Sequence, residues 1–242
     1  MGWIKFVACA DLHGDNQDAG AVRVFKRFVG DYRPDVRAML GDCWDFRPLR
    51  AKATDEEKNE DMTGDWIAGK RFLEWYRPQY FLEGNHEARL HRMAEFSSGL
   101  VRKWAEEALA DYKRFLRELK CRVLPYHKSR GVLRLGHLKL MHGFFTGKFA
   151  AKRTAEIYGS VLMGHTHTVD EFPVPSLDRR VARCIGCLCL LDLDYDEARP
   201  DTLRHAHGWA YGVISDKTGA YHVNQAECIE GKWLLPAGFK EY

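Results

Sequence analysis

Five short fragments of the sequence carry residue types that bind metal ions, and most of them directly follow an apolar run. In chain order they are Asp11-Leu12-His13, Gly41-Asp42, Gly84-Asn85-His86-Glu87, His142-Gly143 and Gly164-His165-Thr166-His167. Carboxylate, amide and imidazole donors suit Mn, Fe, Zn and related divalent ions. One such fragment would carry little weight. All five in succession predict a fold that gathers them around two adjacent metal ions.

The apolar pattern of the first third explains how the fragments would meet. It predicts strands over 3–9, 36–40 and 79–82, with helices over 17–31 and 66–76 between them. This alternation indicates βαβ units and a parallel sheet. Ligands of such sheets collect beyond the carboxyl ends of the strands, where the first three fragments lie. The charged stretch of roughly 50–63 lacks apolar periodicity and is predicted to be a mobile loop.

The rest of the chain predicts further layers. Helical spacing near 87–96 and over 100–119 favours an inserted helical cap at about 87–120. A hairpin turning at Gly136-His137 and a helix over 148–158 follow, and short β-runs over 169–236 predict a second sheet packed on the first. A chain of 242 residues is expected to form a single domain, 1–242, around these elements.

Charge and hydropathy restrict the partners. The net charge is +3, but residues 89–134 carry twelve Lys/Arg against five Asp/Glu. Such a segment can face a phosphate backbone, which makes nucleic acid a candidate partner; the solvated face of helices is slightly favoured. No apolar run is long enough to span a membrane. The N-terminus lacks a secretory signal, so we expect a cytoplasmic protein without a membrane partner.

The seven cysteines do not suggest a disulfide framework. Cys184, Cys187 and Cys189 could be half of a zinc site, but no second pair completes it. The favoured interpretation is a buried strand over 181–191, in which cysteine acts as a small hydrophobe. The histidines of His205-Ala206-His207 follow no apolar strand and are expected in a loop.

The order D-x-H, G-D, G-N-H-E, H-G, G-H-T-H resembles the calcineurin-like metallophosphoesterase superfamily, over residues 11–167. The run Gly84-Asn85-His86-Glu87-Ala88-Arg89-Leu90 looks most like compact members of phage or prophage origin. The resemblance implies an α/β (α+β) fold: a four-layer αββα sandwich of two mixed β-sheets flanked by helices, here with a helical insert. This agrees with the strands and helices expected above.

The resemblance also implies a division of the metal ligands. Asp11, His13 and His167 would hold one ion; Asn85, His142 and His165 would hold the other. Asp42 would bridge both. Mn is the ion expected first, with Fe, Zn, Ni or Mg as alternatives.

His86 would be catalytic, protonating the leaving oxygen or stabilising its charge. Asp45 would orient His86, although a helix N-cap or solvent-facing role for Asp45 is equally open. Arg47, Asn85 and Arg89 are the candidate contacts to the substrate phosphate. By resemblance, the nucleophile would be a metal-bridging hydroxide that attacks the phosphate ester in line.

The substrate class stays open between alternatives. The first is a phosphodiester, nucleotide or nucleic-acid phosphate. The second is a Ser/Thr phosphoprotein or small-molecule phosphomonoester, favoured by Glu87 and by a pairing of Asp45 with His86. Protein phosphatases, however, continue with Arg-Gly where this chain has Phe46-Arg47. The third is a non-catalytic nucleic-acid or protein binding module on the same fold. Oligomeric state is not indicated.

Overall fold

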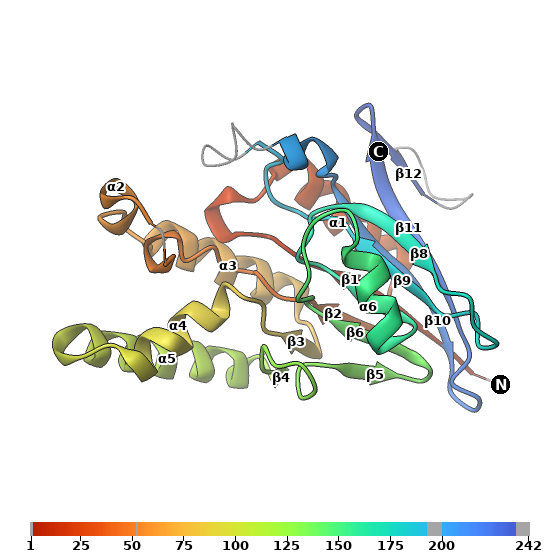
Figure 1. The fold of residues 1–242 in the computed structure, drawn as a ribbon, viewed down its shortest axis with the longest axis horizontal. Helices are drawn as coiled ribbons and strands as arrows, with labels where there is room; N and C mark the ends of the chain where they lie inside the picture. Colours follow the sequence, from red (N-terminus) through yellow and green to blue (C-terminus); the bar gives the residue numbers. More distant parts are fainter. Residues whose placement is uncertain (1, 52, 193–199, 236–242) are drawn as a thin grey trace.

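A computed structural model describes residues 2–51, 53–192 and 200–235, and its centre is a pair of mixed β-sheets (Figure 1). Within these ranges the first sheet has seven strands and the second has five. The first runs β12 (Lys232–Leu234), β11 (Tyr221–Ile229), β10 (Gly208–Ser215), β1 (Trp3–Cys9), β2 (Val36–Met39), β3 (Tyr80–Leu82) and β4 (Arg122–Leu124). The second runs β5 (Leu133–Leu135), β6 (Leu138–Met141), β7 (Val161–Met163), β9 (Val181–Ile185) and β8 (Val169–Pro173).

Helices lie on the outer faces of the two sheets and to one side of them (Figure 1). They are α1 (Ala19–Tyr32), α2 (Asp55–Lys58), α3 (Thr63–Tyr76), α4 (Glu87–Phe96), α5 (Gly99–Glu118) and α6 (Ala150–Tyr158). None of the helices in the described segments combines the length and the apolarity needed to cross a membrane.

Three apolar cores separate the four layers and confirm the predicted αββα sandwich. Strand β1 shows why: Val7 and Cys9 face the core under α1 and α3, whereas Phe6 and Ala8 face the core between the sheets. Successive side chains of a strand point to opposite faces, so a strand buried on both sides is apolar throughout. The third core lies between the second sheet and α6.

The parallel strands direct their carboxyl ends to one edge of the sandwich. Strands β1 to β4 are mutually parallel in the first sheet, and β6, β7 and β9 are parallel in the second. The loops that leave β1, β2, β3, β6 and β7 contain the five sequence fragments. The fold therefore brings fragments that are far apart in the chain to a common edge.

The prediction for 169–236 is wrong in part. Only β8 and β9 join the second sheet, while β10 to β12 extend the first. Strand β10 pairs antiparallel with β1, from Trp3 opposite Ser215 to Ala8 opposite Ala210. It is buried along most of its length, so it needs covering layers on both faces, which an edge of the second sheet would not provide. The predicted strand over 181–191 also ends early, at Ile185, because Gly186 turns the chain with φ +77°.

The predicted loop over 50–63 contains a short helix, α2. Thr54 accepts a hydrogen bond from the backbone N–H of Glu57, and the Glu57 carboxylate accepts one from Thr54 N–H. This capping box needs no apolar face, which is why apolar periodicity did not reveal it.

Helices α4 and α5 pack against each other and extend from one side of the sandwich (Figure 1). The buried Glu83, just after β3, ties both helices to the sheet. Its Oε1 accepts a hydrogen bond from Tyr112 of α5 at 3.0 Å and lies 2.9 Å from His91 Nε2 of α4. The description of 87–120 as a cap over the substrate stays a prediction.

Helix α1 is held by aromatic packing, which gives a test of the first core. Phe28 is fully buried, with its ring centroid 5.3 Å from that of Trp209 and 4.8 Å from that of Tyr211. We expect Phe28→Ala to lower the free energy of unfolding by about 3–5 kcal/mol, because it leaves a cavity. Phe96→Ala is the control, because Phe96 is 76% exposed and should cost no more than about 0.5 kcal/mol. Urea unfolding measures both, and equal losses would contradict this packing.

Candidate metal centre

The seven residues expected to bind metal lie together at the carboxyl edge of the sandwich. Two clusters of donor atoms share Asp42: one contains Asp11, His13 and Asp42, and the other contains Asp42, His142 and His165. Within each cluster the donor atoms lie within 4.8 Å of one another. His167 Nε2 lies 3.1 Å from His13 Nε2, and Asn85 Oδ1 lies 2.9 Å from His142 Nε2. His167 thus adjoins the first cluster and Asn85 the second.

The backbone of these loops is left-handed at five of the seven positions. Positive φ angles occur at Asp11 (53°), His13 (53°), Asp42 (49°), His165 (72°) and His167 (55°). Non-glycine residues avoid this region at a cost of about 1–2 kcal/mol each. Hydrogen bonds between the loops hold the strained backbone. The amide of Asp11 donates to the Gly41 carbonyl at 3.0 Å, and those of Leu12 and His13 donate to the Asp42 carbonyl at 2.9 and 3.0 Å.

Two positions in the fragments must be glycine because atoms of neighbouring loops lie where a side chain would be. Gly41 has φ +91°, and a Cβ there would lie 2.7 Å from His142 Nδ1. A Cβ on Gly84 would lie 2.1 Å from the Asp42 carboxylate. Glycine before Asp42 and before Asn85 therefore lets three loops converge.

The donor atoms suit a bound cation. Asp11 Oδ1 is buried and accepts no hydrogen bond from any described residue, which is costly for a carboxylate oxygen. Burial raises the pKa of Asp11 to about 7, despite the opposing charge of His142. The facing ring nitrogens of His13 and His167 could both bind a divalent ion once His13 has lost its proton. Carboxylate and imidazole donors of this kind match Mn, Fe and Zn.

The ionisable side chains of the centre differ in the direction of their pKa shifts. Burial opposes protonation of His13 and His142, but Asp45 and Asp42 respectively hold the pKa of each near 9. Burial would raise the pKa of Asp42, yet the charges of His142 and His86 keep that pKa well below its ordinary value. Burial and the charge of His13 hold the pKa of His167 well below the usual range. Asp42 is thus ionised beside His142, whose Nε2 lies 3.2 Å from the Asp42 carboxylate.

These protonation states predict that metal binding releases protons. His13 and His142 must lose a proton to become ligands, so apparent Mn²⁺ affinity should rise between pH 6.5 and 8.5. The slope should approach about tenfold per pH unit for each proton released. Calorimetric titration in buffers of different ionisation enthalpy counts the protons. An affinity independent of pH over this interval would contradict the predicted charge states.

His86 and Asp45 form a second group beside the clusters. His86 Nδ1 lies 2.9 Å from the Asp45 carboxylate and 2.8 Å from the Asp45 carbonyl oxygen. Asp45 is buried and also accepts a hydrogen bond from Asn16 Nδ2 at 3.0 Å, so it does not face solvent. Burial would raise the pKa of Asp45, but hydrogen bonds from His13 and His86 hold it well below its ordinary value.

The two candidate arginines differ in their partners. Arg89 donates to His86 Nε2 at 2.8 Å and to the Asp45 carbonyl oxygen at 2.6 Å, so it lies directly at the site. Arg47 instead contacts the carboxylates of Asp15, Asp45 and Glu60. A role for either in binding phosphate stays a prediction, and Arg47 would have to leave these carboxylates.

Two buried carboxylates organise the site without belonging to the predicted set. Glu87 accepts hydrogen bonds from the backbone N–H groups of Asp42, Cys43, Trp44 and Gly84 at 2.9, 2.8, 3.3 and 2.8 Å. Asp65 accepts from Asp45 and Phe46 at 3.0 and 2.8 Å. The sequence pointed to Glu87 because this residue belongs to one of the five fragments. It gave no indication of Asp65, since nothing nearby in the sequence marks that residue as a partner of Asp45.

Cys189, which was expected in a buried strand, and His205, which was expected in a loop, also lie near the centre. Cys189 Sγ is 3.7 Å from His167 Nδ1 and falls in a donor cluster with His13 and His167. The ring of His205 is 5.0 Å from that of His167, measured between centroids. Cys189 is placed by its neighbour Leu188, whose N–H donates to the Asp11 carbonyl oxygen at 3.0 Å. His205 is placed by Ala206, whose N–H donates to the His167 carbonyl oxygen at 2.7 Å.

Glu87→Gln tests the support of the Asp42 loop. The amide would present N–H groups to backbone N–H groups, so the loop should shift. Metal affinity should then fall by about 10–100-fold, as for other residues that hold a ligand in place. The control is Glu106→Gln on the exposed face of α5, which should not change affinity. A folded Glu87→Gln protein with normal Mn²⁺ affinity, measured by calorimetry, would refute this role.

The chain matches known proteins at the level of family and fold. The family model of calcineurin-like phosphoesterases matches residues 4–169. A predicted phosphoesterase from Streptococcus pneumoniae is similar in structure, with 17% identity and a TM-score of 0.40 over 100% of this chain and 98% of that one. A metallophosphoesterase from Sphaerobacter thermophilus has 14% identity and a TM-score of 0.46 over 93% and 88%. Vacuolar Protein Sorting 29 from Cryptosporidium parvum has 12% identity and a TM-score of 0.47 over 99% and 98%. Comparison with curated sequences gives no significant match.

Proposed function

The chain belongs to the calcineurin-like phosphoesterase family, and from that premise we propose that it is a dinuclear-metal-dependent hydrolase of a phosphodiester or of a nucleotide or nucleic-acid phosphate. The observation that carries the proposal is the pair of donor clusters sharing Asp42, with His86 Nε2 3.6 Å from the Asp42 carboxylate. A shared carboxylate is the arrangement that two-metal hydrolases use to hold neighbouring ions.

The donor set divides between two ions in this proposal. Asp11, His13 and His167 would hold one, Asn85, His142 and His165 would hold the other, and Asp42 would serve both. When bound, such ions lower the pKa of coordinated water and neutralise charge on the phosphate. Mn is the ion expected first, with Fe, Zn, Ni or Mg as alternatives, since the set combines oxygen donors that suit Mn and Mg with imidazoles that suit Fe, Zn and Ni.

His86 is proposed to act on the leaving oxygen. Asp45 accepts the Nδ1 hydrogen bond, which fixes the ring and leaves Nε2 directed toward the Asp42 side of the centre. The negative charge of Asp45 stabilises His86 when Nε2 carries a proton. Arg89 now donates to Nε2. A substrate phosphate would draw this guanidinium to its own oxygens. Nε2, which now accepts a hydrogen bond, would then have to take up a proton from solvent before it could donate that proton to the leaving alkoxide.

His86→Asn tests this role. Turnover of bis-p-nitrophenyl phosphate with Mn²⁺ should fall about 10²–10⁴-fold, the usual contribution of a general acid. Metal content, measured by mass spectrometry, should not change, because His86 is not among the proposed ligands. His222→Asn is the matched control, since His222 is exposed on β11, and it should keep full activity. Unchanged turnover in His86→Asn, or inertness of the metal-loaded protein toward mono- and diesters, would count against the proposal.

A phosphomonoesterase is the second candidate, and one observation favours it. The Asp45–His86 contact of 2.9 Å is the pairing that the resemblance associates with Ser/Thr phosphatases. The ratio of rates on p-nitrophenyl phosphate and bis-p-nitrophenyl phosphate decides between the two. A strong monoester preference would displace the phosphodiester proposal.

A further inference from the structure

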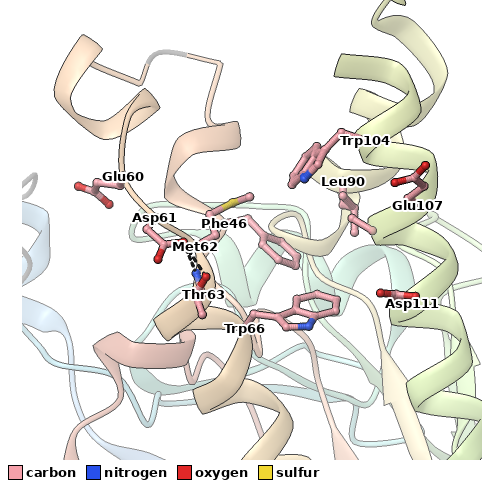
Figure 2. Close-up of a pocket in the computed structure, with 11 residues that line it drawn as sticks. Phe46, Glu60, Asp61, Met62, Thr63, Trp66, Leu90, Trp104, Glu107 and Asp111 are labelled. Atoms are coloured by element: carbon pink, nitrogen blue, oxygen red, sulfur yellow. Dashed lines mark hydrogen bonds between the residues drawn. The ribbon is translucent and has the colours of Figure 1, made fainter. Parts of the chain in front are cut away.

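A cavity of about 500 Å³ lies between the start of α3 and the helices α4 and α5 (Figure 2). Its walls are largely aromatic and aliphatic: Phe46, Met62, Trp66, Leu90 and Trp104. Its acidic residues are Glu60 and Asp61 on one side and Glu107 and Asp111 of α5 on the other. The size is that of a small-molecule site, and the mixture of apolar wall and few polar groups is typical of one.

The cavity adjoins the reaction centre through two chain segments. Phe46 directly follows Asp45, and Leu90 directly follows Arg89. Asp45 and Arg89 both contact His86. The wall of the cavity formed by Phe46 and Leu90 is therefore next to residues of the centre along both segments.

The charge of the cavity is opposite to that expected from the surrounding sequence. Residues 89–134 carry a net +7, yet no lysine or arginine of the described chain lines the cavity. Glu107 and Asp111 stand one turn apart on the face of α5 that lines it. Asp111 is already paired with Arg114 at 2.6 Å and Glu60 with Arg47 at 2.8 Å, so the negative charge of the cavity comes mainly from Asp61 and Glu107. This charge would attract a cation.

An ammonium group already lies against one of the aromatic walls. Lys70 Nζ is 4.8 Å from the centroid of the Trp66 ring. Trp104 lines the cavity from α5 and is 42% exposed, so its ring is accessible to a ligand. Aromatic walls combined with carboxylates are the chemistry that recognises organic ammonium ions.

We propose that this cavity binds an organic ammonium group carried on the alcohol portion of the substrate. The inference rests on the proposed function, because it assigns to the phosphoesterase centre an ester with a cationic, apolar head. Trp104 would contact the alkyl groups and the charge, and Glu107 would supply the opposite charge. Extended nucleic acid is then disfavoured as the substrate.

Direct binding tests the cavity without requiring hydrolysis. Choline and its neutral isostere 3,3-dimethylbutan-1-ol are titrated calorimetrically into the Mn²⁺-loaded protein. We expect choline to bind at least about tenfold more tightly than the isostere. Trp104→Ala should weaken choline binding roughly five- to thirty-fold, and Glu107→Gln should weaken it as well. Glu106→Gln, one residue away and paired with Arg102, is the control and should bind as the parent does.

Hydrolysis then separates this inference from the proposed function. Trp104→Ala and Glu107→Gln should raise KM for p-nitrophenyl phosphorylcholine by a larger factor than KM for bis-p-nitrophenyl phosphate, which carries no ammonium group. Equal binding of the isostere, or no choline binding by a protein that hydrolyses bis-p-nitrophenyl phosphate, overturns the cavity assignment alone. Choline binding without hydrolysis of any ester overturns the phosphoesterase proposal but supports an ammonium site. Preference for thymidine 5′-p-nitrophenyl phosphate, lost in Trp104→Ala, would identify the cavity as a nucleobase site and overturn the inference.

Discussion

The structure around the candidate metal centre depends on how Asp42 is held. Its carbonyl oxygen accepts two amides from the loop after β1, its carboxylate accepts the amide of His86, and its own amide donates to Glu87. Two of these bonds come from the loop after β1 and two from the segment after β3, so a residue with φ 49° is fixed from two sides. Such strain persists only where the surroundings over-determine the conformation. One aspartate thus sets the relative positions of the loops after β1, β2 and β3.

The sequence predicted the elements and residues that local patterns specify. The early strands and helices carry strong apolar periodicity, and the fragments at the strand ends mark where polar side chains should meet. The sequence pattern did not indicate that β10 pairs with β1, because a short apolar strand can pair with many sheet edges. The support from Asp65 was hidden for a similar reason. A carboxylate that accepts backbone N–H groups twenty residues away looks like any acid in a first helical turn.

The net positive charge of the segment containing α4 and α5 does not predict the charge of the cavity that these helices line. Their basic composition suggested a surface for phosphate backbones. Residues that are neighbours in a helix sequence point in different directions, however, so one face can be acidic while the segment as a whole is basic. Glu107 and Asp111 fall on the side facing the cavity, beside Trp104. The segment over 46–66, which forms the opposite wall, lies about forty residues earlier in the chain. Only the packed structure brings the two walls together and shows that the charge between them is negative.

The donor clusters draw on both sheets, and this has a consequence for synthesis of the chain. Asp11, Asp42 and Asn85 follow strands of the first sheet, whereas His142, His165 and His167 follow strands of the second. The first half of the chain supplies mainly oxygen donors, and most of the imidazoles arrive only after residue 141. A nascent chain on the ribosome therefore lacks a complete site until the two sheets have docked face to face. Occupancy by metal would then report that the sandwich is assembled, and ions would act as a cross-link between halves of the protein made at different times.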